Sequence, residues 1–185
     1  AFYIPNIISL IIIGYVWRFI FSRGFDSLYA LTRWNVFQLS WLGDSKLAFL
    51  SVALVSVWQS IGFYMVIYIA GLQTVPKEQL EAAVIDGATP VSRFFRVTLP
   101  LIMPSVTVCV FYSLSNALKT FDVIFSLTFG GPGTATTSIA LDIYRTAFSD
   151  SRFGYGAAKS VILFLIILVV TVVQLTAFKR REVEP

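Results

Sequence analysis

Few residues of this sequence could take part in catalysis. The 185 residues contain no histidine and one cysteine, Cys109, which excludes a disulfide within them, a multi-cysteine zinc site and histidine-based catalysis. Residues 154–160 read GYGAAKS, but Ala158 stands where a phosphate-binding loop of the form GxxxxGK, followed by Ser or Thr, has its second glycine, and no strand precedes it. We therefore predict no catalytic residue, no metal and no cofactor, and Cys109 is expected to be a small buried hydrophobic residue.

Polar residues near the ends of apolar stretches could instead bind a ligand rich in hydroxyl groups. The first candidates are Asn116, Lys119, Thr120 and Asp122. Charged groups near membrane depth are costly and point to function, and Lys119 and Asp122, three positions apart, could share a helix face and pair. The open alternative is that these residues meet water at the outer interface. Weaker candidates are Gln59, Tyr64 and Tyr68, although tyrosines at span ends are common interface anchors.

A short polar helix is predicted over residues 76–88, which include EAAVIDGA at 81–88. Pro76 suits the first turn, Glu78 lies near the positive end of the helix dipole, and Gly87 comes where a glycine would end the helix. A small apolar face is expected from Leu80, Ala83 and Val84. A second short helix should follow, with Thr89 as N-cap and Pro90 at the first helical position. On pattern alone a passive interfacial helix is favoured over one that docks in a groove of another protein.

The elements that carry these residues are expected to be membrane helices. The chain is 57% hydrophobic and 13% charged, about half the charge of a soluble domain, and the apolar residues form long runs. We predict an all-α, polytopic membrane protein with spans at roughly 2–21, 47–72, 97–118 and 160–178. Residues 123–141 are also uncharged, but Gly130–Gly133 would break a helix there. They are predicted to form a half-helix and an irregular loop, a form that often borders transport pathways.

Charge gives a direction to this topology. The net charge of +4 is assigned to membrane flanks and not to a nucleic-acid surface. The run Lys179–Arg181 after the last span favours a cytoplasmic C-terminus under the positive-inside rule. Loop 73–96 is then cytoplasmic and segment 123–141 extracytoplasmic, within a single transmembrane domain over 1–185. The start, AFYIPNII, has no initiator Met or basic flank, and we expect a fragment that begins at a span.

The residues around 81–104 resemble the EAA loop of ABC importer permeases. That loop reads in outline EAA-x-x-DGA, a Phe six residues after the last Ala, then TLP-x-x-x-P. The matching positions here are Glu81–Ala83, Asp86–Ala88, Phe94, Thr98–Pro100 and Pro104. The resemblance extends over nearly the whole chain through WRFIF at 17–21, WQSIGFYMVIYIAGLQ at 58–73, GGPG at 130–133, IYRTAF at 143–148 and FGYGAA at 153–158. Together they are similar to the maltose- and glycerol-phosphate-type sugar permeases that carry GGPG before the last span.

This resemblance implies a type I ABC importer permease core in a bacterial or archaeal cell membrane. Two permeases, usually different chains, form the pathway, each EAA loop docks on one subunit of an ATPase dimer, and an extracytoplasmic solute-binding protein delivers the sugar. The permease is non-catalytic, and its partner hydrolyses ATP. The ATPase-coupling residues implied here are Glu81, Ala82, Ala83, Asp86, Gly87 and Ala88, and the pathway residues are Gln59, Tyr64, Asn116, Lys119, Thr120 and Asp122. Family members usually have six or more spans, so further spans are expected upstream.

Two alternative functions stay open. An ion-coupled carrier would place ionisable groups in its spans, but the cores of the second, third and fourth predicted spans have none. An amino-acid or peptide permease shares an EAA-like loop, but the GGPG and IYRTAF segments favour sugar. The sequence does not identify the sugar or the partner permease.

Overall fold

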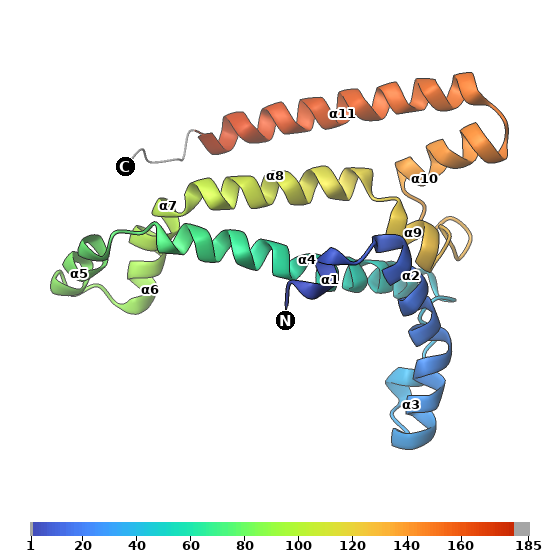
Figure 1. The fold of residues 1–185 in the computed structure, drawn as a ribbon, viewed down its shortest axis with the longest axis horizontal. Coiled ribbons are helices and arrows are strands. Elements are labelled where there is room, and N and C mark those ends of the chain that lie inside the picture. The colour runs from blue at the N-terminus through green and yellow to red at the C-terminus, as the bar shows by residue number, and fades with distance from the viewer. Residues whose placement is uncertain (1, 180–185) are drawn as a thin grey trace. The chain divides into compact units, whose positions relative to one another are not determined.

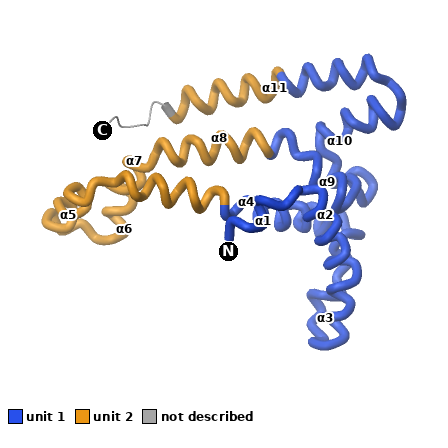
Figure 2. The backbone as a smooth tube through the Cα atoms, viewed as in Figure 1, with its two compact units in different colours: residues 1–62, 117–164 blue, residues 63–116, 165–185 orange. Residues whose placement is uncertain are grey.

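The structure, a computed structural model, describes residues 2–179, and these fold almost entirely into helices, without a strand among them (Figure 1). The predicted all-α class is confirmed. Figure 2 divides the chain into two compact units. Unit 1 holds the residues up to Gly62 and Ala117–Phe164, and unit 2 holds Phe63–Asn116 and the chain from Leu165. Three long helices continue from one unit into the other, and each unit is described by itself.

The first predicted span is a broken element in unit 1. Helix α1 covers Ile4–Ile7 and α2 covers Leu10–Phe19, with Ile8 and Ser9 in extended conformations between them. Beyond α2 the helix continues through the π-helical turn η1 (Ile20–Gly24) into α3 (Phe25–Thr32). It ends where Arg33 adopts a left-handed conformation, with φ 56°, and a 3-10 turn, η2 (Asn35–Gln38), follows. An unbroken helical element thus runs from 10 to 32, and the bounds of the first span stay a prediction.

Helix α4 spans Ser45–Gln73 and is long and apolar enough to cross a membrane. It begins at an aspartate cap, because Asp44 Oδ1 accepts hydrogen bonds from the backbone N–H groups of Lys46, at 2.9 Å, and Leu47, at 3.0 Å. Serine hydroxyls inside α4 donate to carbonyls one turn back, so that they stay satisfied in an apolar setting. Each of these bonds, from Ser51, Ser56 and Ser60, is 2.8 Å long.

The core of unit 1 lies where α2, α4 and α9 (Asp122–Leu127) meet. Its buried members are Ile13, Phe21, Val52, Val55, Val123, Ile124, Leu127 and Leu141. Helix α2 packs closely on α9 because Gly14 has no side chain. A Cβ atom at Gly14 would lie 1.8 Å from Ser126 Oγ. Such close packing through small residues is typical of membrane helices, which approach one another without a hydrophobic driving force.

After α9 the chain forms an irregular loop, 128–138, over the sequence TFGGPGTATTS. Helix α10 (Ile139–Tyr144) starts at Ser138, whose hydroxyl accepts from the Leu141 N–H at 3.2 Å. It passes into the π-helical turn η4 (Arg145–Ser149). Helix α11 then runs over Phe153–Lys179, starting several residues before the span predicted at 160–178. It is the second helix of the described part with the length and composition to cross a membrane.

Unit 2 holds most of the stretch predicted as the third span, and this stretch is bent. After α4 the chain forms, in order, α5 (Lys77–Ile85), α6 (Pro90–Arg93), the π-helical turn η3 (Phe94–Thr98), α7 (Leu99–Leu101) and α8 (Met103–Lys119). The segments Pro90–Leu101 and Met103–Lys119 meet at 73°. Pro104 causes a break here, because it has no N–H to donate to Pro100 and its ring collides with that carbonyl. If the bent pair counts as one crossing, residues 2–179 hold three candidate spans, and the four predicted crossings stay a prediction.

Helices α4 and α8 pack against each other within unit 2. Gly71 lies against Ser105, since a Cβ atom added there would be 2.2 Å from the serine Oγ. Farther along, the rings of Phe63 and Tyr112 have centroids 4.5 Å apart. This pairing of α4 with α8 holds the loop that joins them, which carries α5 and α6 (Figure 1).

Candidate functional site

The predicted short helix is α5. It begins at Lys77, one residue after Pro76, where the prediction had placed its start. Pro76 occupies the N-cap position in an extended conformation, with φ −61° and ψ 131°. The first helical residue is therefore Lys77, and Glu78 lies in the first turn. A carboxylate there interacts favourably with the unpaired N–H groups at the helix start.

The end of α5 is fixed by a tight pair of backbone hydrogen bonds. Gly87 has φ +76°, a left-handed conformation that glycine adopts without steric cost. Its N–H donates to the Val84 carbonyl at 3.0 Å, and the Ala88 N–H donates to the Ala83 carbonyl at 3.0 Å. These two bonds form a Schellman motif, which satisfies the last carbonyls of a helix. The prediction that Gly87 ends the helix is confirmed, with a geometry that few other residues could adopt.

The second short helix follows at once. Thr89 is extended, and its hydroxyl accepts from the Ser92 N–H at 3.3 Å, with Pro90 at the start of α6. The predicted Thr89 cap is confirmed. After Arg93 the helix continues as the π-helical turn η3. Two capped helices joined by the four residues 86–89 make a compact loop with few free backbone groups.

The side chains of EAAVIDGA differ sharply in exposure. Ala83 is buried, with 8% of its surface exposed, so it packs inside this chain. Glu81, Ala82, Asp86 and Gly87 are exposed and Ala88 is half-buried. The predicted apolar face is only partly used, because Val84 is exposed while Leu80 and Ala83 turn inward. Ile85 is 85% exposed. It was not among the predicted site residues, and the signal that could have marked it as a candidate contact residue is a large aliphatic side chain at the end of a polar helix.

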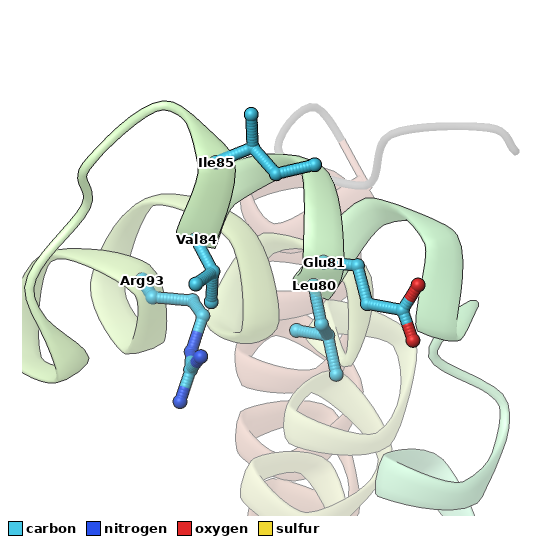
Figure 3. Close-up of a pocket in the computed structure, with 5 residues that line it drawn as sticks. All are labelled: Leu80, Glu81, Val84, Ile85 and Arg93. Atoms are coloured by element: carbon cyan, nitrogen blue, oxygen red, sulfur yellow. The ribbon is translucent and has the colours of Figure 1, made fainter.

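A shallow pocket of about 340 Å³ lies between α5 and α6. It is lined by Leu80, Glu81, Val84, Ile85 and Arg93. Figure 3 shows the Arg93 side chain beside Val84, whereas the Glu81 carboxylate points away from Arg93. Glu81 and Arg93 do not form an ion pair with each other. Within residues 2–179 the ion pair is that of Lys159 with Asp142. The pocket floor is apolar, and both charges are available at its edges.

Among the predicted pathway residues, Tyr64 and Tyr68 lie on the face of α4 that packs on α8. The Tyr64 hydroxyl is within hydrogen-bonding reach of Ser113, and Tyr68 is within reach of Cys109. Cys109 is buried, as expected of a small hydrophobic residue. Gln59 is half-buried in the part of α4 that belongs to unit 1.

The polar group after α8 is not arranged as predicted. Helix α8 ends at Lys119 and α9 begins at Asp122, so these residues do not share one helix. Phe121, with φ −131°, interrupts the helix between them. The predicted pairing of Lys119 with Asp122 is wrong, since the ion pair of the described residues lies elsewhere. Both are exposed, as is Asn116, and Thr120 is half-buried. Asn116 and Tyr64 belong to unit 2, whereas Gln59, Lys119, Thr120 and Asp122 belong to unit 1. A ligand site shared by these six residues therefore stays a prediction.

The GGPG loop is held by threonine side chains that no motif in the sequence singles out. The hydroxyls of Thr128 and Thr136 lie 2.8 Å apart, and Thr136 Oγ1 also contacts the Gly131 carbonyl at 2.8 Å. Gly130 has φ +79° and Gly133 has φ +57°, as a turn of this kind requires. Arg145 donates to the Phe129 carbonyl and lies 5.0 Å from the centroid of the Phe129 ring. The loop is therefore an ordered element and not only a helix break.

The chain matches, over residues 1–182, the family described as binding-protein-dependent transport system inner membrane component. It is 44% identical to the probable starch degradation products transport system permease protein AmyD of Thermoanaerobacterium thermosulfurigenes, covering 100% of this chain and 63% of that protein. It is 34% identical to the multiple sugar-binding transport system permease protein MsmF of Streptococcus mutans, covering 98% and 63%. It is 37% identical to the sn-glycerol-3-phosphate transport system permease protein UgpA of Yersinia pseudotuberculosis, covering 96% and 61%. The chain thus spans less than two thirds of the length of these relatives.

Similarity to a solved structure concerns the fold alone. A crystal structure of a bacterial ABC transporter involved in the import of the acidic polysaccharide alginate matches with a TM-score of 0.81 and 23% identity, covering 97% of this chain and 63% of that chain. The chain therefore shares its fold with a chain of that transporter. With the family match over almost its entire length, the chain belongs to the family of binding-protein-dependent transport system inner membrane components, the ABC importer permeases that its EAA loop resembles.

Proposed function

We propose that this chain is part of the transmembrane subunit of an ATP-driven, binding-protein-dependent sugar importer. The subunit forms half of the translocation pathway by alternating access, beside a second permease that is a different chain. Relatives named for starch degradation products, multiple sugars and glycerol phosphate support a carbohydrate-type substrate. The apolar helices α4 and α11 support a multi-pass protein of a bacterial or archaeal cell membrane.

The observation that carries the proposal is the doubly capped loop of α5 and α6. Helix α5 is closed at its end by a Schellman motif and is followed closely by the capped helix α6, so we expect the two helices to move as one body. It can therefore pass a displacement on to α4 and α8, which enter and leave it. We propose that this loop is a coupling helix that binds one subunit of an ATPase dimer, and that ATP hydrolysis takes place in that partner.

The contacts proposed for the ATPase come from the exposed side of this loop. Glu81 presents a carboxylate that no cation of the described chain pairs with, and it suits a basic group on the partner. Ala82 and Gly87 are exposed and small, so a partner can approach the backbone closely. Ile85 adds an exposed aliphatic side chain that binding would remove from water. Ala83 is buried in this chain, and its proposed part in coupling is to support the loop from within, beside Asp86 and Ala88 at the end of the helix.

An extracytoplasmic solute-binding protein is the proposed source of the sugar. The solved alginate transporter has also been crystallised in complex with an alginate pentasaccharide-bound periplasmic protein, and this supports a partner of that kind for the present chain. Gln59, Tyr64, Asn116, Lys119, Thr120 and Asp122 remain the proposed pathway residues. Uptake of radiolabelled sugars compared with amino acids tests the substrate class, and preferential uptake of amino acids would overturn it.

Replacing Ile85 by aspartate should release the ATPase from the complex. The change puts a charge at a position that is 85% exposed, so this chain folds as before while the apolar contact with the partner is lost. We expect the recovered ATPase to fall by about tenfold or more, as for a central interface residue. The measurement is co-purification of the ATPase through an affinity tag on the full-length permease, expressed with its partner permease and ATPase.

A matched control is Leu31→Asp, since Leu31 is 83% exposed and lies in α3, far from the loop in sequence. The control should retain the ATPase at the wild-type level. Equal recovery with the Ile85→Asp and wild-type permeases would refute a contact at Ile85. Failure of the wild-type permease to recover any ATPase, with both proteins folded, would refute the importer assignment.

A further inference from the structure

A charged side chain lies near the start of the long apolar helix α11. Lys159 Nζ forms an ion pair with Asp142 Oδ2 at 2.7 Å and donates to Thr146 Oγ1 at 2.9 Å. It also lies 4.7 Å from the centroid of the Tyr155 ring. The Lys159 side chain is 24% exposed, so most of its length is covered and its ammonium group meets three partners at once.

The partners of Lys159 come from the two preceding elements. Asp142 lies in α10 and Thr146 in the π-helical turn η4. Gly156 permits this approach, because a Cβ atom there would lie 2.8 Å from the Ala147 Cβ. The Asp142, Thr146 and Lys159 side chains, here named the polar clasp, therefore join α10 and η4 to the first turns of α11.

The segment held by the polar clasp also holds the GGPG loop. Arg145, between Asp142 and Thr146 in the chain, donates to the Phe129 carbonyl and lies against the Phe129 ring. Phe129 has φ 52°, a left-handed conformation that costs free energy in a bulky residue and persists only where surrounding contacts impose it. All of these residues belong to unit 1. A chain of contacts thus runs from Lys159 through η4 and Arg145 to the loop.

We propose that Lys159 is a positioning residue, which fixes the GGPG loop through the polar clasp and so keeps the pathway segment before it in its substrate-binding form. The effect on substrate rests on the proposed function. The loop follows directly on α9, whose first residue is the candidate pathway residue Asp122. The polar clasp can hold the segment in place because Lys159 makes charge-assisted hydrogen bonds, which are stronger than neutral ones, and because its side chain is partly covered. A neutral residue at 159 would leave η4 attached to the start of α11 by the packing of Gly156 on Ala147 and by the backbone bond from the Arg152 N–H to the Thr146 carbonyl, at 3.0 Å.

The test uses hydrogen–deuterium exchange of the full-length permease in lipid nanodiscs. Lys159→Met removes the charge and keeps the apolar stem. We expect amide exchange in residues 129–150 to become about tenfold faster, as loss of one charge-assisted contact predicts, with exchange in 77–93 unchanged. The charge swap Lys159→Asp with Asp142→Lys should restore slow exchange. Arg152→Met is the matched control, since Arg152 lies over the same Tyr155 ring but forms no ion pair in the described chain.

The second readout is uptake by the assembled importer. Lys159→Met should raise the half-saturating sugar concentration several-fold and leave the maximal rate near wild type, because the loop loses position and the coupling loop does not change. If Lys159→Met fails to insert, Asp142→Asn makes the same test with the lysine in place. Exchange in 129–150 equal to that of wild type would overturn the inference and leave the proposed function standing. A wild-type complex that takes up no sugar would overturn the proposed function and leave the polar clasp standing.

Discussion

Gly87→Pro is expected to abolish ATP-driven uptake while the permease still inserts in the membrane. Gly87 has φ +76°, whereas proline is locked near −65°. Proline also lacks the N–H that Gly87 donates to the Val84 carbonyl. The Schellman motif therefore cannot form, and α5 loses its fixed relation to α6. Because the loop lies between long helices and outside their cores, insertion should not depend on it.

The milder variant Gly87→Ala should give an intermediate rate, since a non-glycine residue in the left-handed region costs roughly 1–2 kcal/mol. Gly154→Ala is the control, because Gly154 has no neighbouring atom within 4 Å of an added Cβ and lies in helix α11. Initial uptake rates in proteoliposomes, at equal permease content, give the comparison. Uptake by the Gly87→Pro permease at the wild-type rate would show that the turn plays no part in coupling.

Gly14→Ala should have the largest effect on stability. The added Cβ would lie 1.8 Å from Ser126 Oγ and 3.3 Å from the Leu127 backbone nitrogen, so α2 and α9 must separate. Ser126 is fully buried and its hydroxyl already donates to the Asp122 carbonyl at 2.7 Å, which leaves it little freedom to move. Overpacking of this kind costs about 1–3 kcal/mol. Thermal unfolding of the purified permease in detergent should show the loss as a lower midpoint.

A second substitution identifies the cause of that loss. Ser126→Gly removes both side-chain atoms that the new methyl group meets, so Gly14→Ala with Ser126→Gly should recover part of the stability. The control is Gly24→Ala, where the nearest atom to an added Cβ is the Ile20 Cγ2, at 3.6 Å, an ordinary contact. If Gly14→Ala and Gly24→Ala unfold at the same temperature, the close approach of α2 and α9 is wrong.

Local signals in the sequence predicted the capping of helices α5 and α6 well. Gly87 and Thr89 lie within five residues of the backbone groups whose hydrogen bonds they complete. Residue type and spacing are therefore enough to predict both helix ends. Pro76 was placed one position too far into the helix, because proline suits both the N-cap and the first helical residue. The all-α class followed from long apolar runs, since helices satisfy their own backbone in lipid.

Features set by tertiary packing could not be predicted in this way. The break at Ile8 and Ser9 lies inside an apolar run, where hydropathy does not distinguish a straight helix from a broken one. The bend at Ile102 has a local signal in Pro104, but its angle depends on packing. A pairing of Lys119 with Asp122 requires a continuous helix, and Phe121 interrupts the helix between them. The polar clasp joins residues up to 17 positions apart, and a single charged residue in a helix does not reveal its partner.

The measurement that tests the coupling helix most directly is a site-specific crosslink to the ATPase. A photo-crosslinker is attached to the thiol of an Ile85→Cys variant of the full-length permease, in which Cys109 and any further cysteine are replaced by serine. Leu31→Cys, equally exposed, is the matched site outside the loop. We predict a covalent permease–ATPase product from Ile85→Cys and none from Leu31→Cys. A product from neither site, or equally from both, in a complex that still transports sugar would contradict a coupling role for α5.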